Sequence, residues 1–422
     1  MTEEGLRLGD EGLRLEAGPL PLGVHSEVGP LHRVLVHRPD LSLRRLTPAN
    51  RRELLFDEVL WVARAGEDHD RFVELLRGRG VEVLYLRELL EQVVTHPEAR
   101  RWIVDRRVGR LRQGDVAPDL REALLEMDPA TLVRHLVGGM TLGELPFRPR
   151  GLLAASRPDT HFVLPPLPNH LFTRDTSAWV YDGLLVSHMA RPARSQEVVH
   201  LRAIYRFHPL FRGVDFPVWG GDEDMDYTPA SLEGGDVLVL GGGAILIGMG
   251  ERTAPQAVEM LARRLFDAGA ARRVLAVTLP HLRQYMHLDT VMTMIDRDAF
   301  CIFPGISRTM RTWSLRPDEG GGLRVDVEPD LFEALADGLG VERVRVLTAG
   351  GDEYQAEREQ WDDGNNVLAV APGTVIGYDR NVDTNRTLEG AVIEVLTVPG
   401  SELGRGRGGA RCMSCPLWRG PA

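Results

Sequence analysis

The amino-acid sequence predicts an α/β protein built from a repeated unit, with one helical domain inserted into the chain. Two observations support this prediction. Apolar strand-like runs alternate with amphipathic helical segments along most of the chain, which is the pattern of α/β architectures. Residues 87–150 lack this alternation, because their apolar positions recur at helical spacing with no strand signal.

The repeated unit is clearest at residues 244–280, where a strand-like run leads into a helix and then into a second apolar run. Similar units begin near residues 34, 184, 300 and 374. Each unit is too small to bury its own apolar face, so neighbouring units must stack. Five units suggest a closed, pseudo-symmetric ring. An open doubly wound sheet is the alternative, but no nucleotide-binding glycine fingerprint follows a suitable first strand.

Glycines 241–243 are followed by another strand-like run, so we expect a hairpin turn there. The domain prediction has three parts. Residues 1–20 form a disordered N-terminal segment, residues 87–150 form the inserted helical domain, and the α/β catalytic domain comprises residues 21–86 and 151–422.

Composition excludes several classes of protein. The 422 residues are 43% hydrophobic and 26% charged, which is typical of a folded soluble protein, and the net charge of −11 argues against a general polyanion binder. The longest apolar run, residues 237–250, is too short and too rich in glycine to span a bilayer. The N-terminus lacks the basic and apolar regions of a secretory signal. Three cysteines do not make a disulfide framework, so we expect a reduced, cytoplasmic protein.

Four stretches combine polar residues and glycines with apolar strands: residues 165–179, 232–240, 286–296 and 405–416. Together they supply the following candidates: Asp175, Glu233, Asp236, His287, Asp289 and Cys412. If residues 286–296 are a strand, His287 and Asp289 project to the same face. Taken alone, each motif is explained by a surface pair, a glycine turn or a local ion pair.

The combination favours a cationic substrate with an electrophilic carbon. Carboxylates bind a planar guanidinium through paired, charge-assisted hydrogen bonds. A cysteine thiolate is a competent nucleophile, and a histidine can protonate a leaving amine and then activate water. Several carboxylates, one histidine and one cysteine therefore indicate chemistry on a guanidinium.

The stretch RGRGGARCMSCPLWR, residues 405–419, has four interpretations. A zinc site lacks enough nearby ligands, and a redox Cys412–Cys415 pair lacks the usual position early in a βαβ unit. A nucleic-acid tail conflicts with the acidic chain. The favoured interpretation is a nucleophile, Cys412, on a tight turn made by glycines 406, 408 and 409, with nearby arginines that favour the thiolate.

At nearly full length the sequence resembles the arginine deiminases, which belong to the guanidine-modifying enzymes. The resemblance rests on a series of motifs in a fixed order: GVHSEVGPLHRVLVHRP (23–39), LTPANRRELLFDEV (46–59), LPPLPNHLFTRDTSAW (164–179), EGGDV (233–237), GMGER (248–252), MHLDTV (286–291), AEREQWDDGNNVLAVAPG (356–373), GRGRGG (404–409) and RCMSCPL (411–417). It implies a five-bladed α/β propeller with an inserted helical domain. It also implies hydrolysis of L-arginine to L-citrulline and ammonia, with no metal and no organic cofactor.

The resemblance implies a role for each matching residue. Cys412 matches the nucleophile that forms an amidino-cysteine intermediate, and His287 matches the general acid and base. Glu233 matches the acid that orients this histidine, and Asp175 and Asp289 match the carboxylates that grip the guanidinium. The residues that surround the substrate's α-amino and α-carboxylate groups in the family match Asn169, Phe172, Arg194, Arg252 and Arg407. Leu55 matches a residue that lines the pocket. Asp236 is expected to be structural.

Further expectations concern the substrate, the partners and the pH optimum. The arginines for an α-carboxylate favour free L-arginine over agmatine, which lacks that group. Two alternatives stay open: a relative that acts on another guanidine, and a non-catalytic arginine-binding protein. The expected partner is the small-molecule substrate, without nucleic acid or membrane, and a homo-oligomer is expected from the family. Arg411 departs from the histidine found in some members and is expected to shift the pH optimum.

Overall fold

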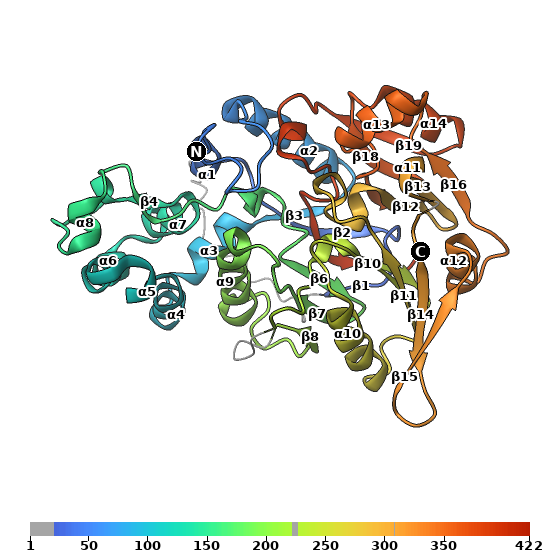
Figure 1. The fold of residues 1–422 in the computed structure, drawn as a ribbon, viewed down its shortest axis with the longest axis horizontal. Coiled ribbons are helices and arrows are strands. Elements are labelled where there is room, and N and C mark those ends of the chain that lie inside the picture. The colour runs from blue at the N-terminus through green and yellow to red at the C-terminus, as the bar shows by residue number, and fades with distance from the viewer. Residues whose placement is uncertain (1–20, 222–226, 308) are drawn as a thin grey trace, which may run out of the picture.

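The computed structural model describes residues 21–221, 227–307 and 309–422 (Figure 1). The expected disorder of residues 1–20 therefore lies outside the described residues. The strands and helices are mixed along the chain, as predicted. In the described part of the chain, no helix is both long enough and apolar enough to cross a membrane.

Five copies of one unit make up most of the molecule. In each copy an antiparallel pair of strands leads through a helix to a third strand, which runs parallel to the second. The first copy comprises β6 (Ser177–Val180), β7 (Gly183–Val186), α9 (Pro192–Phe207) and β8 (Val218–Gly220). The second comprises β9 (Val237–Gly241), β10 (Ala244–Met249), α10 (Pro255–Asp267) and β11 (Arg273–Thr278).

The other three copies repeat this order of elements. The third comprises β12 (Met292–Asp296), β13 (Ala299–Ile302), α12 (Leu331–Leu339) and β16 (Arg345–Thr348). The fourth comprises β17 (Leu368–Ala371), β18 (Thr374–Tyr378), α14 (Val382–Gly390) and β19 (Glu394–Val398). The fifth comprises β20 (Cys415–Arg419), β2 (Leu31–Val36), α2 (Val62–Gly78) and β3 (Glu82–Tyr85).

The fifth unit joins residues from both ends of the described chain. Strand β20 lies between β2 and the short β1 (Gly23–Val24), in the order β1-β20-β2-β3. Each unit forms its own sheet, and no single sheet closes on itself among the described residues. The predicted hairpin turn is confirmed, because Gly241, Gly242 and Gly243 link β9 to the antiparallel β10 and all have positive φ.

A group of helices lies to one side of the sheets (Figure 1). It comprises α3 (Leu86–Val93), α4 (Pro97–Arg107), α5 (Arg110–Gln113), α6 (Ala117–Glu126), α7 (Pro129–Gly138) and α8 (Leu152–Ser156). The predicted helical character of residues 87–150 is confirmed, with one difference: β4 (Met140–Thr141) pairs with β5 (Phe162–Leu164). Two residues are too few to leave a strand pattern in the sequence.

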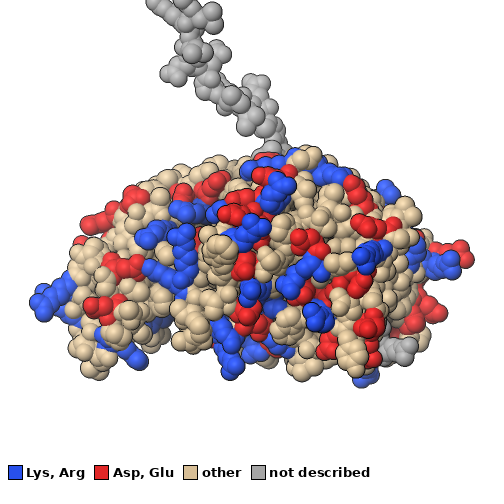
Figure 2. Space-filling model, turned by 90° about the horizontal axis from the view of Figure 1, so that it is seen from above, with Lys and Arg blue, Asp and Glu red and all other residues tan. Residues whose placement is uncertain are grey.

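Four more elements connect the units: α1 (Leu41–Arg44), α11 (Pro304–Ser307), α13 (Glu353–Trp361) and a hairpin formed by β14 (Thr312–Pro317) and β15 (Leu323–Glu328). The hairpin belongs to the third unit in sequence, yet it pairs with β11 and extends the sheet of the second unit. Acidic and basic side chains are interspersed over the face in Figure 2, with no continuous basic surface on that face.

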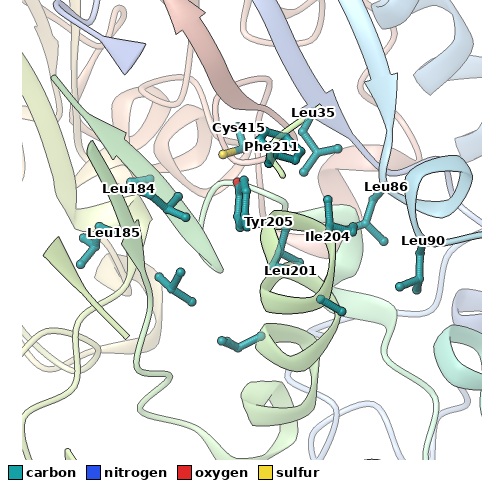
Figure 3. Packing of buried hydrophobic residues seen from close by; sticks show 14 of the residues in the cluster. Leu35, Leu86, Leu90, Leu184, Leu185, Leu201, Ile204, Tyr205, Phe211 and Cys415 are labelled. Carbon is teal, nitrogen blue, oxygen red and sulfur yellow. The ribbon is translucent and has the colours of Figure 1, made fainter. Parts of the chain in front are cut away.

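Helix α9 connects the helical group to the sheets. It packs on α3 and α4, and its apolar side joins a buried cluster that reaches the sheets (Figure 3). The labelled members of this cluster are Leu35, Leu86, Leu90, Leu184, Leu185, Leu201, Ile204, Tyr205, Phe211 and Cys415. The cluster therefore holds the two parts of the molecule together.

Leu201→Ala should lower the free energy of unfolding by about 2–5 kcal/mol, because Leu201 is fully buried in this shared cluster and its loss leaves a cavity. The matched control is Ser195→Ala on the exposed side of the same helix, which should change stability by less than about 0.5 kcal/mol. Urea unfolding followed by circular dichroism measures both. Equal stability of the two variants would contradict the proposed role of α9.

Candidate active site

The candidate site residues share a position in the repeated unit. Asp175 precedes β6, Glu233 precedes β9, His287 and Asp289 precede β12, and Cys412 precedes β20. The same segment of four units therefore delivers polar side chains to one place. The remaining unit obeys the same rule, because Asn366 lies just before β17.

His287 lies between two carboxylates. Its Nε2 is 2.7 Å from Glu233 Oε2, and its Nδ1 is 3.6 Å from Asp175 Oδ1. All three side chains are buried. The expected strand at residues 286–296 begins only at Met292; before it, Leu288–Thr290 form a 3-10 turn. The prediction was wrong there because Asp236 accepts the Leu288 N–H at 2.8 Å, so a side chain rather than a neighbouring strand fixes this backbone.

Burial and neighbouring charges have opposite effects on the pKa values of His287 and Glu233. Burial alone would lower the pKa of His287, but Asp175 and the hydrogen bond to Glu233 raise it to about 9. Burial would raise the pKa of Glu233, yet His287 and Arg252 bring it to about 2. His287 is therefore an imidazolium at neutral pH, and Glu233 is a carboxylate.

Cys412 faces a carboxylate. Its Sγ lies 3.7 Å from Asp289 Oδ2 and 3.8 Å from Oδ1. Burial raises the pKa of the Cys412 thiol well above its usual range, and Asp289 and Asp175 raise it further. Arg411 opposes this effect but does not outweigh it. Arg411 thus favours the thiolate, as expected, but burial and the carboxylates have the larger effect on this pKa.

Arg411 forms ion pairs with a carboxylate on each side. Its Nη1 lies 2.7 Å from Asp289 Oδ2, and its Nε lies 3.0 Å from Glu27 Oε2. Two backbone carbonyls, those of Gly235 and Val237, accept its remaining hydrogen bonds. Arg411 thus fixes Asp289 beside the thiol and links the segment before β20 to the segment after β1.

Asn366 was quoted in a motif but given no role by the sequence. Its Oδ1 accepts the Cys412 N–H at 3.0 Å, and its Nδ2 donates to the Asp289 carbonyl at 2.9 Å. One amide therefore ties the segment of Cys412 to the segment of Asp289. The signal that would have found it is its place before the first strand of its unit.

The glycines before Cys412 act through close packing rather than through unusual backbone angles. A Cβ on Gly408 would lie 2.3 Å from the Phe172 ring, and a Cβ on Gly409 would lie 2.4 Å from the Asn366 carbonyl oxygen. The residue with positive φ is Arg407, at 61°. The expected tight turn is present, but its left-handed residue is an arginine.

The described residues enclose a pocket next to Cys412. Its lining comprises Leu55, Asn169, Phe172, Asp175, Arg194, Arg252, Arg283, Met286, His287, Gly406, Arg407 and Cys412. Nine of these are predicted site residues. Glu233 and Asp289, the other two, lie behind His287 and Cys412. Arg283 and Met286 were missed because their motif, RQYMH, places them before the predicted histidine without a recognisable pattern.

The three predicted arginines differ in how they are used. Arg194 contacts Asp175 and Glu197 and donates to the carbonyls of Asn169 and Phe172, so its donors are largely engaged. Arg252 lies 3.5 Å from Glu233 Oε2.

Arg407 stacks on Trp361 at 3.7 Å, and its Nη2 donates to the Gln284 carbonyl. Its Nε and Nη1 are buried without a partner within the described ranges. Arg407 therefore keeps hydrogen-bonding capacity for an anionic group.

The other cysteines are separate from this site. Cys301, Cys412 and Cys415 are all free thiols. Cys415 points its Sγ toward the Ser177 carbonyl at 3.4 Å and belongs to a different apolar cluster from Cys412. Within residues 21–221, 227–307 and 309–422, no group of three or more His, Cys, Asp or Glu is arranged to hold a metal ion.

Solved structures with a similar fold cover most of this chain at low sequence identity. The amidinotransferase SxtG from Microseira wollei matches with a TM-score of 0.54 and 13% identity over 96% of this chain and 98% of its own. The N-terminal domain of ArgZ, an arginine dihydrolase from cyanobacteria, matches with 0.52 and 14% over 92% and 98%. DDAH from Pseudomonas aeruginosa matches with 0.50 and 14% over 92% and 100%.

Unliganded AgrE is another match, with a TM-score of 0.52 and 15% identity, and the chain spans 40% of its length. These likenesses show the fold that the chain shares with guanidine-modifying enzymes. The sequence model that describes arginine deiminases matches residues 52–419, which is most of the chain. The chain belongs to the arginine deiminase family.

Proposed function

We propose that this protein hydrolyses L-arginine to L-citrulline and ammonia through a covalent amidino-cysteine intermediate. The observation that carries the proposal is one pocket lined by the buried side chains of Cys412, His287 and Asp175, with the Asp289 carboxylate next to the thiol. Cys412 supplies the nucleophile, His287 the proton donor, and Asp175 and Asp289 the negative charge. A guanidinium offers a carbon for the nucleophile to attack, an amino group for the proton donor and a positive charge for the two carboxylates.

A cationic substrate also counteracts the raised pKa of the Cys412 thiol. The carboxylates that raise the pKa of Cys412 lose this effect once a guanidinium pairs with them. The thiolate then forms beside the guanidinium carbon that it attacks. Asp289, whose oxygens lie 3.7 and 3.8 Å from Sγ, is placed to accept the thiol proton. Ionisation of the nucleophile is thereby coupled to substrate binding.

The remaining steps use one imidazole twice. Attack by Sγ forms the S–C bond and a tetrahedral adduct. His287 donates its proton to one amino group, the C–N bond breaks, and ammonia leaves the amidino-cysteine. The neutral His287 then takes a proton from water, whose oxygen bonds to the same carbon. The C–S bond breaks last and releases L-citrulline, a proton and the Cys412 thiolate.

The α-carboxylate of arginine has a natural partner in Arg407. Arg407 lines the pocket with its Nε and Nη1 unpartnered, and a carboxylate there can accept a charge-assisted hydrogen bond from this guanidinium. Asn169 and Arg252 line the same pocket. Agmatine has no carboxylate and would leave the Arg407 donors buried without an acceptor. This favours free L-arginine as the substrate.

The five repeated sheets support a five-bladed propeller as the architecture. Each unit delivers the residues before its first strand to the site, as blades around an axis do. The reaction requires a reduced Cys412, which is consistent with a cytoplasmic protein.

A relative that acts on another guanidine, such as a methylated arginine, is the second candidate. DDAH, named as a dimethylarginine dimethylaminohydrolase, has the same fold. Comparison of kcat/KM for arginine and methylated arginines separates the two.

The proposed function is tested by citrulline release from L-arginine, with agmatine as the second substrate. We expect wild type to convert arginine and not agmatine, and Cys412→Ala to release no detectable citrulline while it remains folded. Retained arginine binding by this variant, measured by calorimetry, would separate lost chemistry from lost binding. No turnover of arginine by reduced, folded wild type would refute the proposal and favour another guanidine or a binding role.

Glu233→Gln should shift the alkaline limb of the kcat profile to lower pH by about one to two units. The imidazolium of His287 is present below its pKa of about 9 and is lost as the pH rises through that value. Removal of the carboxylate lowers this pKa, since such a hydrogen bond is worth about 1.5–3 kcal/mol and one pKa unit about 1.4 kcal/mol.

The matched control for this shift is Glu251→Gln, because Glu251 contacts Arg191 and Arg252 rather than His287. Its alkaline limb should stay in place. The assignment of His287 as the proton donor would be wrong if both variants kept the wild-type profile.

Asn366→Ala should reduce kcat by about 10- to 100-fold with a smaller change in KM. Loss of the amide frees the Cys412 N–H and the Asp289 carbonyl, and misplacement of a nucleophile by about 1 Å costs about 100-fold. Steady-state kinetics measure the effect, and circular dichroism controls for folding. A folded variant with wild-type kcat would show that this amide does not position Cys412.

A further inference from the structure

The hairpin of β14 and β15 leaves one strand edge unpaired. In the strand order β15-β14-β11-β10-β9, β15 is the outermost strand, and its only strand partner within the described residues is β14. The hairpin projects from the body of the molecule at the bottom of Figure 1. Helix α12, which follows β15, packs on β9 and β11 instead of covering this edge. A long, open edge is a template for pairing with another strand.

The side chains of β15 alternate between an apolar and a charged face. Leu323, Val325 and Val327 share one face, and Val325 and Val327 are 50% and 68% exposed. On β14 they lie opposite Pro317, Leu315 and Trp313, respectively. Trp313, Leu315 and Val325 line a groove of about 440 Å³ against α10. The open edge therefore carries an exposed apolar stripe.

The backbone of the same three residues faces outward. Asp318 N–H donates to the Gly322 carbonyl at 3.1 Å and closes the hairpin. Hydrogen-bonded pairs in an antiparallel ladder alternate, so Arg324 and Asp326 bond to β14. Leu323, Val325 and Val327 then direct their N–H and C=O groups away from β14. The absence of an N–H at Pro317, opposite Leu323, agrees with this assignment.

We propose that β15 pairs with β15 of a second copy of this chain, antiparallel and centred on Val325. In this register Val325 lies opposite the partner's Val325, and Leu323 lies opposite the partner's Val327. Arg324 lies opposite the partner's Asp326, and the twofold axis repeats this pair. Two five-stranded sheets join into one continuous sheet across the dimer.

Charge selects this register over its neighbours. A twofold axis at residue 324 would place arginine against arginine, and an axis at residue 326 would place aspartate against aspartate. An axis at residue 327 would place Asp326 against the partner's Glu328. Like charges directly opposite each other are destabilising, whereas opposite charges and β-branched pairs stabilise a sheet. Of these registers, only the axis at Val325 gives two attractive pairs without a like-charge pair, and it buries the apolar stripe.

The charge pattern allows a test by complementary variants, with molar mass measured by sedimentation across a concentration series. Wild type should dimerise. Arg324→Asp places aspartate against aspartate twice, and Asp326→Arg places arginine against arginine twice. Each variant alone should associate more weakly by about tenfold or more. A mixture of the two variants restores both opposite-charge pairs and should form a dimer with one chain of each kind.

The mixture also excludes an effect within one chain. Arg324 Nε and Asp326 Oδ2 of the same strand lie 2.9 Å apart, and each single variant breaks this ion pair. Mixing does not repair it, so restored association must come from contacts between chains. A monomeric wild type, which would leave the edge to a different partner, or single variants that dimerise as tightly as wild type, would overturn the proposal.

A backbone variant provides an independent check. Val325→Pro removes an outward N–H without removing a hydrogen bond to β14, so it should give a monomer. Val325→Thr keeps the N–H and the branched side chain and should remain a dimer. A dimer that persists in Val325→Pro would also overturn the proposal.

Measurement of arginine hydrolysis by the same variants tests the dimer independently of the proposed function. No residue of 312–328 lines the catalytic pocket, so each variant should keep the wild-type turnover per chain, and the association readouts hold even if arginine is not the substrate.

Discussion

The candidate site depends on one electrostatic constraint: a thiol that is buried among carboxylates cannot ionise easily. Asp289 and Asp175 raise the pKa of Cys412, and burial raises it further. Only a cation that enters this space relieves the repulsion between a thiolate and its neighbours. In the proposed function, substrate binding and ionisation of Cys412 are then the same event.

The repeat explains how residues far apart in sequence meet. Each unit begins with a buried strand, and the segment just before that strand carries the polar side chains. Asp175, Glu233, His287, Asn366 and Cys412 come from five different units and occupy equivalent positions. Contacts such as the hydrogen bond from the Leu288 N–H to the Asp236 carboxylate hold these segments in place at the ends of the sheets.

Much of this arrangement could be predicted from the sequence. Apolar runs located a strand and a helix of each of the five units, and the resemblance to arginine deiminases identified nine residues that line the pocket. The strand expected at residues 286–296 was wrong because a buried side-chain acceptor decides the backbone there. The charge of Cys412 could not be predicted, since it depends on which of Asp289, Asp175 and Arg411 lies nearest in space. Asn366 was missed because its place before the first strand of its unit is the one signal that marks it, and an amide that binds backbone groups adds no other pattern.

The order of strands in the fifth unit has a consequence for biosynthesis. Strand β20 lies between β1 and β2, so residues near the start of the chain stay without their central partner until residues 415–419 have been made. Cys412 lies three residues before this strand. The placement of Cys412 therefore depends on completion of this sheet. A truncation that removes residues 415–419 acts on the sheet and on the position of Cys412 together.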